Sequence, residues 1–260
     1  LFGVKVISRS NSAPYGWSKN FVKRYIFKII LNLANKVMVN SKQFKNDLKK
    51  EFNVNAVCIY NPLNVNEIKI KSKKKTLKIF SKNKQLKILN VGRFTDQKDQ
   101  ITLLKSLKFL DDQNFKYEAV IIGKGVLESR LKKYIEINKL TKRVKLINFT
   151  ENPYNLMRQT DIFVLSSRYE GLPNVLLEAL VLNKFIISSN CPTGPREILL
   201  NGRGGFLFKM GNYKELSNKI IYYSNNKQEC LKKKKYAVKY LNRFDFKKNL
   251  NKYYELINSI

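Results

Sequence analysis

A short apolar strand, a polar loop and an apolar helix follow one another in residues 161–180, which read DIFVLSSRYEGLPNVLLEAL. Residues 162–165 are apolar without interruption, which is typical of a strand covered on both faces, and Pro173 fits the first position of a helix. Such strands belong to parallel sheets with helices on both sides. The unit therefore predicts an α/β fold in which the loop 166–172 lies at the carboxyl end of a strand, where such sheets bind ligands.

Two carboxylates lie in this unit, Glu170 in the loop and Glu178 in the helix. Leucine and alanine flank Glu178 on both sides, so a carboxylate there needs a partner that offsets its desolvation. Gly171 would let a ligand approach the backbone, and the start of the helix would direct unpaired N–H groups at the same place. The alternative interpretation is one solvated glutamate before an ordinary helix and one on the helix surface.

Strand-like and helix-like segments alternate along the chain in two groups. Residues 1–63 contain three predicted strands, with a basic amphipathic helix at 18–35, and residues 86–243 contain five more strands with helices between them. Alternation of this kind predicts two parallel sheets. Between the groups, the Lys-rich segment 64–85 is interpreted as a solvated connector. No helix precedes the first strand, so the first group resembles the end of a domain.

The chain is strongly basic, with a net charge of +32 from 51 Lys and Arg residues against 19 Asp and Glu. Such an excess suggests nucleic acid or an anionic membrane as a partner. The accompanying Asn and Ile are also the composition that an AT-rich genome would impose on solvated faces. Trp17, next to Lys19, Lys23 and Arg24, is either a membrane-interface anchor or the cap of a helix.

Several kinds of chemistry are excluded by residues that the chain lacks. It contains no His, which rules out Ser-His-Asp triads and His metal sites. Its three cysteines, Cys58, Cys191 and Cys230, have no metal-ligand spacing and fit a reducing compartment. No apolar run approaches the ~20 residues that span a bilayer.

Further polar residues follow other predicted strands. Arg93 and Lys98, after the strand KILNV, can clamp a diphosphate, because a guanidinium binds two oxygens at once and an ammonium adds a point charge. The sequence CPTGPREILLNGRGGFLF places Glu197 in a short helix between two glycine-bearing turns, which is also an ordinary turn-helix-turn pattern. Gly-Lys-Gly at 123–125 lacks the third glycine of a dinucleotide fingerprint, since Glu128 stands there.

Three of these stretches together resemble a known family. SRYEGLPNVLLEA is similar to the E-x7-E motif of glycosyltransferase family 4, with Glu170 and Glu178 as its two acids. VGRFTDQK and SNCPTGPREILLNGRGGFL resemble the other two signatures of that family, in the same order. The resemblance runs across essentially the whole chain and is strongest from Lys87 to Lys209.

This resemblance implies a GT-B fold, two facing Rossmann-like parallel-sheet domains, of which the N-terminal one is incomplete here. It also implies a retaining transferase that needs neither metal nor cofactor and moves a hexose or N-acetylhexosamine from a nucleotide-sugar, UDP-linked rather than GDP-linked, to a lipid-linked or polysaccharide acceptor. Arg93 and Lys98 would bind the donor diphosphate and stabilise the leaving group. Glu178 would hold the ribose hydroxyls, and Glu170 would contact the transferred sugar. The remaining implied contacts are Gly171, Leu172, Pro173 and Asn174 with the donor, and Asn148, Phe149 and Thr150 with the nucleobase.

The chain also departs from the family's pattern. Asp99 follows Lys98 where the family often has Gly, and Asn148 replaces a common Gly, for which we expect left-handed backbone. By resemblance, on the order of a hundred residues of the N-terminal domain, including a His near the reacting sugar, precede Leu1. We therefore expect this fragment alone to be inactive. We also expect a final helix, 244–260, that crosses back to the first domain, and a cytoplasmic protein that binds peripherally to the inner membrane.

Two other functions compete with this one. A basic nucleic-acid-binding protein without enzymatic activity would explain the charge, although the lysines are spread evenly and form no known binding motif. A glycosidase would also use two carboxylates, but they must face one bond at ~5 to 9.5 Å. Specific duplex DNA binding at physiological salt would favour the first alternative.

Overall fold

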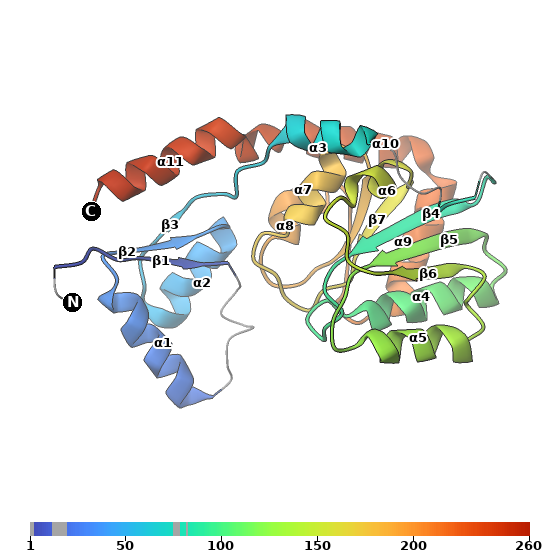
Figure 1. Cartoon of the computed structure of the whole chain (residues 1–260), viewed down its shortest axis with the longest axis horizontal. Helices are drawn as coiled ribbons and strands as arrows, with labels where there is room; N and C mark the ends of the chain where they lie inside the picture. The colour runs from blue at the N-terminus through green and yellow to red at the C-terminus, as the bar shows by residue number, and fades with distance from the viewer. Residues whose placement is uncertain (1–2, 12–19, 75–78, 82) are drawn as a thin grey trace.

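The computed structural model describes residues 3–11, 20–74, 79–81 and 83–260. They form two parallel sheets, which we call the N-terminal sheet and the main sheet (Figure 1). The main sheet has six strands in the order β6-β5-β4-β7-β8-β9, and every neighbouring pair is parallel. These strands are β4 (Leu86–Val91), β5 (Tyr117–Ile122), β6 (Val144–Ile147), β7 (Ile162–Leu165), β8 (Phe185–Ser189) and β9 (Phe206–Phe208).

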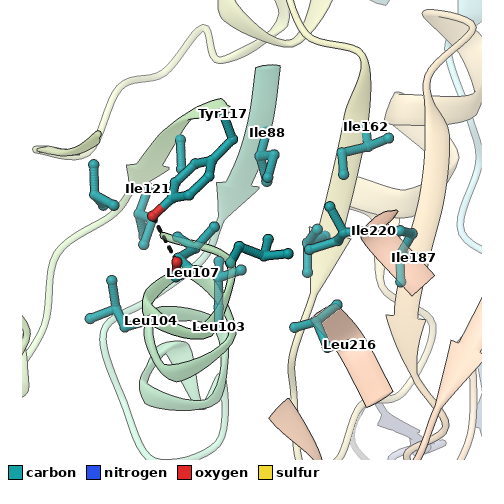
Figure 2. Packing of buried hydrophobic residues seen from close by; sticks show 14 of the residues in the cluster. Ile88, Leu103, Leu104, Leu107, Tyr117, Ile121, Ile162, Ile187, Leu216 and Ile220 are labelled. Atoms are coloured by element: carbon teal, nitrogen blue, oxygen red, sulfur yellow. Dashed lines mark hydrogen bonds between the residues drawn. The ribbon is translucent and has the colours of Figure 1, made fainter. Parts of the chain in front are cut away.

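Successive residues of each main-sheet strand enter different cores, because side chains alternate across a strand. Ile88 and Ile162 pack into one cluster, and their neighbours Leu89 and Phe163 pack into the other. Figure 2 shows the first cluster, in which the Tyr117 hydroxyl donates a hydrogen bond of 2.8 Å to the Leu107 carbonyl. Helices that contribute to this first cluster are α4 (Gln100–Asp112), α5 (Glu128–Ile137) and α9 (Tyr213–Asn225).

The second cluster is covered by helices from distant parts of the sequence. They are α3 (Val65–Lys73), α6 (Tyr154–Arg158), α7 (Asn174–Val181), α8 (Pro195–Ile198) and α10 (Lys227–Lys239), and the 3-10 turn η2 (Leu241–Phe244) follows them. The uninterrupted apolar strands of the sequence are thus buried on both faces, as an α/β sheet requires.

The N-terminal sheet contains β1 (Ile7–Ser10), β2 (Lys36–Val39) and β3 (Ala56–Cys58) in that order, all parallel. Helices α1 (Phe21–Leu33) and α2 (Lys42–Phe52) contribute to the cluster on one of its faces. On the other face, Leu256 of the last helix, α11 (Phe246–Asn258), packs against Met38 and Ile59. Figure 1 shows α11 reaching across from the main sheet to the N-terminal sheet.

Two elements of the structure were not predicted from the sequence. The segment 64–85, predicted to be a connector, contains helix α3, which the Asn64 side chain caps by accepting from the Glu67 N–H at 3.0 Å. Alternating Ile and Lys hid the helix, because only Ile68 of its apolar side chains is buried. Strand β9 was also missed, since its three residues lie directly after a glycine-rich turn.

Candidate functional site

The carboxyl ends of β4 and β7 mark the point where the strand order of the main sheet reverses. From β4 the chain proceeds to β5 and β6 on one side, and then crosses to β7, β8 and β9 on the other. Open α/β sheets bind ligands at such a point, because the loops after the two strands diverge and leave a crevice. Arg93 and Lys98 follow β4, and Glu170 follows β7, so these three residues flank the crevice.

Lys98 and Glu170 form an ion pair across this point. The Lys98 Nζ lies 2.6 Å from Glu170 Oε1, and their side chains are 17% and 6% exposed. The Ser167 hydroxyl donates to the same carboxylate oxygen at 2.6 Å. Because a carboxylate this deeply buried is stable only when it is paired and hydrogen-bonded, the loops after β4 and β7 hold each other in place.

Arg93 lies outside this ion pair. It is exposed at the end of β4, and its backbone carbonyl accepts a hydrogen bond of 3.0 Å from the Gln100 side chain. Gly92, next to it, is close to the Lys98 side chain. Arg93 is therefore open to solvent at the carboxyl end of β4.

Asp99 explains one departure from the family's pattern. Its φ is +45°, in the left-handed region that glycine adopts without strain, which accounts for a glycine being common there. Its buried carboxylate accepts from the Thr102 hydroxyl at 2.8 Å and lies 3.3 Å from Arg168 Nε. The aspartate thus caps α4 and fixes the β7 loop. The left-handed backbone expected at Asn148 is wrong, because Asn148 is not among the residues with positive φ.

Glu178 lies just over one turn along α7 and is partly buried. The sequence predicted that this carboxylate needs a partner, and the structure identifies it as Tyr154 of α6, whose hydroxyl donates to Glu178 Oε1 at 3.4 Å. Burial raises the pKa of Glu178, and the hydrogen bond from Tyr154 offsets only part of that effect. Burial and the neighbouring carboxylate raise the pKa of Tyr154 to about 12.

The backbone between the two glutamates faces the N-terminal sheet. A side chain at Gly171 would collide with the Asn11 carbonyl, which follows β1, and would come within 3.1 Å of Asn40 Oδ1, which follows β2. Leu172 and Pro173 are buried. Pro173 is the N-cap of α7 rather than its first helical residue, and no side chain caps this helix.

Two polar residues that follow strands of the N-terminal sheet, on the wall opposite the β7 loop, were missed in the sequence. Asn40 is 3% exposed, and its Oδ1 has no hydrogen-bond partner. Asn61 donates to Asn174 Oδ1 at 2.7 Å. Since the carboxyl ends of parallel strands share one edge, the polar residues after β1 and β2 could have been assigned to this wall.

Glu197 joins the two sheets on the side of α8. Its carboxylate accepts from the Tyr60 hydroxyl at 2.5 Å and from the Lys42 N–H at 3.0 Å, at the start of α2. A cavity of about 660 Å³ lies beside it, between α2 and the residues that follow β8. Thr193, which lines the cavity, donates its hydroxyl to the Glu170 carbonyl, so the cavity wall continues into the β7 loop.

The residues assigned to the nucleobase follow β6, at the same edge of the main sheet. Phe149 is 59% exposed, and Lys124 Nζ lies 5.4 Å from the centre of its ring. The Thr150 hydroxyl accepts from the Asn152 N–H at 3.3 Å. An exposed ring at this position can stack on a flat ligand.

Metal ligands and membrane spans were sought within the described ranges. No group of three or more Cys, Asp or Glu residues there could hold a metal ion. None of the helices in those ranges is both long and apolar enough to cross a bilayer.

Comparisons with known proteins agree with the sequence motifs. One relative is the N-acetylgalactosamine-N,N'-diacetylbacillosaminyl-diphospho-undecaprenol 4-alpha-N-acetylgalactosaminyltransferase of Campylobacter jejuni. The chain is 27% identical to it over 222 residues, which cover 82% of this chain and 59% of that protein. It is 28% identical over 169 residues to the UDP-Gal:alpha-D-GlcNAc-diphosphoundecaprenol alpha-1,3-galactosyltransferase of Escherichia coli, covering 64% of this chain and 43% of that one. The chain thus spans about half the length of these curated relatives.

A solved structure extends the similarity to the fold. HepE of Anabaena, in complex with UDP and glucose, matches 98% of this chain and 72% of its own with a TM-score of 0.82 and 20% identity. Residues 71–240, more than half of the chain, match the family described as glycosyl transferases group 1. The resemblance seen in the sequence is therefore confirmed, and the chain belongs to the group 1 glycosyltransferases.

Proposed function

We propose that this chain is the donor-binding part of a retaining, metal-independent glycosyltransferase. It would move a hexose or N-acetylhexosamine from a UDP-sugar to a lipid-linked or polysaccharide acceptor. The observation that carries the proposal is the buried Lys98–Glu170 pair at the strand-order reversal of the main sheet. A sugar diphosphate presents a phosphate that attracts the ammonium and hydroxyls that can donate to the carboxylate.

In this proposal, the donor enters between the loops that follow β4 and β7. Lys98 and the exposed Arg93 bind the diphosphate and stabilise the negative charge that develops as the sugar leaves. The uncapped start of α7, at Asn174, adds N–H groups and a partial positive charge. The sugar hydroxyls then replace part of the contact that Lys98 makes with Glu170.

The rest of the donor would lie along the same edge of the sheet. Glu178 accepts hydrogen bonds from the ribose hydroxyls, in addition to the one from Tyr154. The base stacks on Phe149, flanked by Asn148 and Thr150. Gly171 and Leu172 offer backbone N–H groups to the sugar, with Pro173 closing the loop.

The names of the relatives support the choice of substrates. The Escherichia coli relative is named for UDP-Gal, and both curated relatives are named for diphosphoundecaprenol-linked substrates. HepE was solved with UDP and glucose. We therefore propose a UDP-sugar, an undecaprenol-linked class of acceptor, and work at the cytoplasmic face of a membrane.

We also propose the division of the chain that accompanies a GT-B fold. Residues 1–63 would be the end of an acceptor-side domain, 64–85 the connection, 86–243 the nucleotide-sugar domain and 244–260 the returning helix. The opposed carboxyl ends of the two sheets, in contact at Gly171 and Asn11, support this arrangement.

Calorimetric titration with UDP, GDP and a short duplex DNA tests the proposal. We expect UDP to bind, Glu178→Ala to abolish that binding, and the exposed Glu136→Ala to leave it unchanged. DNA binding should be weak and should fall steeply with salt. Specific DNA affinity at physiological salt, together with no response to UDP, would instead establish the nucleic-acid-binding alternative.

A further inference from the structure

Helix α1 carries a broad apolar face that the described structure leaves exposed. Seven of its apolar side chains are between 43% and 81% exposed, whereas Leu31 is buried at 6%. The seven are Phe21, Val22, Tyr25, Ile26, Ile29, Ile30 and Leu33. A helix of a soluble α/β domain normally turns its apolar residues to the sheet, so most of the apolar surface of α1 faces the wrong way for a core.

The inner side of α1 is fixed independently of this face. Leu31 packs in the cluster against the N-terminal sheet. Arg24 pairs with Glu51 of α2 at 2.7 Å and lies 4.9 Å over the Phe52 ring. At about 100° per residue, Arg24 and Leu31 project in nearly the same direction, and the exposed apolar residues occupy roughly the opposite half of the helix.

Two lysines border the exposed apolar face. On the same helical projection, Lys23 lies roughly 20° beyond one edge and Lys28 roughly 20° beyond the other. Lysine in such positions can lay its apolar stem along an apolar surface while its ammonium stays at the level of lipid headgroups. The sequence of α1, FVKRYIFKIILNL, contains no acidic residue.

We infer that α1 is an in-plane membrane helix, whose apolar face enters the headgroup region of an anionic bilayer. Apolar residues bordered by lysines are the pattern of interfacial helices, and the net charge of +32 adds a long-range attraction to anionic lipid. A second copy of the chain fits this face less well. A symmetric dimer through α1 would bring Lys23 and Lys28 against the same lysines of its partner.

This assignment deepens the proposed work at a membrane and moves the anchor to a different place. The sequence pointed to Trp17, which lies outside the described residues. The structure points instead to the side of α1 that faces away from the N-terminal sheet.

Vesicle flotation with residues 1–260 tests the inference, using phosphatidylcholine alone and mixed equally with phosphatidylglycerol. We expect binding to the anionic vesicles and little to the neutral ones. The variant Ile26→Ser/Ile29→Ser should lower binding at least tenfold. The matched control Val126→Ser/Ile137→Ser, which changes two other exposed apolar residues, should bind as the wild type does.

A second pair of variants tests the role of the lysines. Lys23→Gln/Lys28→Gln should weaken binding by about fivefold per lysine, which corresponds to about 1 kcal/mol each. The control Lys133→Gln/Lys142→Gln, on the main-sheet side, should have a much smaller effect.

Three results would overturn the inference. The first is that Ile26→Ser/Ile29→Ser binds anionic vesicles as tightly as the wild type, and the second is equal binding to neutral vesicles. The third is a wild-type dimer in sedimentation that the same variant makes monomeric, since a second copy would then cover the face. UDP titration of each variant keeps the two proposals separate, because the changed residues of α1 are not among the proposed donor residues.

Discussion

Breaking the Lys98–Glu170 ion pair from the lysine side is the sharpest test of how the two loops are held. Lys98→Met keeps the length of the side chain and removes its charge. Glu170 is 5% exposed and would then retain the Ser167 hydroxyl but no cation at 2.6 Å. The charge left behind is buried, and its desolvation is no longer offset.

The size of the effect follows from this geometry. Removing one partner of a fully buried pair is destabilising by about 3–5 kcal/mol. Here the Ser167 hydrogen bond remains and the Lys98 side chain is 17% exposed, so we expect about 2–3 kcal/mol. For a chain of this size, each kcal/mol shifts the melting temperature by roughly 2 °C, which gives a fall of about 4–6 °C.

Thermal unfolding of three variants and the wild type measures the coupling directly. Lys98→Met should be the least stable, and Lys98→Met/Glu170→Gln should recover at least half of the loss, because the double variant buries no unpaired charge. Lys133→Met, on the exposed side of α5, serves as the control. The reasoning is refuted if Lys98→Met has the same melting temperature as the wild type, or if the double variant is as unstable as Lys98→Met.

Three other perturbations have defined outcomes. Desolvation raises the pKa of Glu178, so the folded state loses stability as pH rises through the carboxyl range. Glu178→Gln should therefore have a higher melting temperature than the wild type at pH 7, and the difference should close below pH 4.5. Equal melting of the two proteins at pH 7 would show that this carboxylate is not desolvated. Gly171→Ala should lower the melting temperature by several degrees, because its methyl group would meet the Asn11 carbonyl. The control Gly92→Ala makes only ordinary contacts and should be tolerated. Similar melting temperatures of the two variants would count against close contact of the two sheets. Glu197→Ala should lower the free energy of unfolding by about 1–3 kcal/mol, since it removes a contact between the sheets. The radius of gyration in small-angle scattering should increase. An unchanged radius would mean that this contact does not hold the two sheets together.

The sequence predicted the main sheet well because its strands are continuous apolar runs. Residues 162–165, for example, are all buried, and their short length and β-branched and aromatic side chains favour a strand over a buried helix. The loops after the strands could then be placed at one edge, where Lys98 and Glu170 lie although 72 residues separate them, but the direct ion pair between the two was not predicted.

Other features depended on contacts that a single sequence does not reveal. The α3 helix has one buried apolar side chain, so its pattern resembles a solvated segment until α6 and α7 are in place. The position of Asn40 beside Gly171 depends on contact between the main sheet and the N-terminal sheet, which no local sequence pattern predicts. The partner of Glu178 is a tyrosine on a five-residue helix, too short to be predicted from periodicity.

The position of α11 has a consequence for the order in which the protein folds during synthesis. Leu256, four residues from the end of the chain, completes the packing of Met38 and Ile59 in the N-terminal sheet. These strands leave the ribosome before α11, so Met38 and Ile59 lack this packing partner until that helix has emerged. Burial of this face of the N-terminal sheet is therefore delayed until α11 has been synthesised. Premature termination near residue 245 would leave an apolar surface that chaperones or proteases recognise.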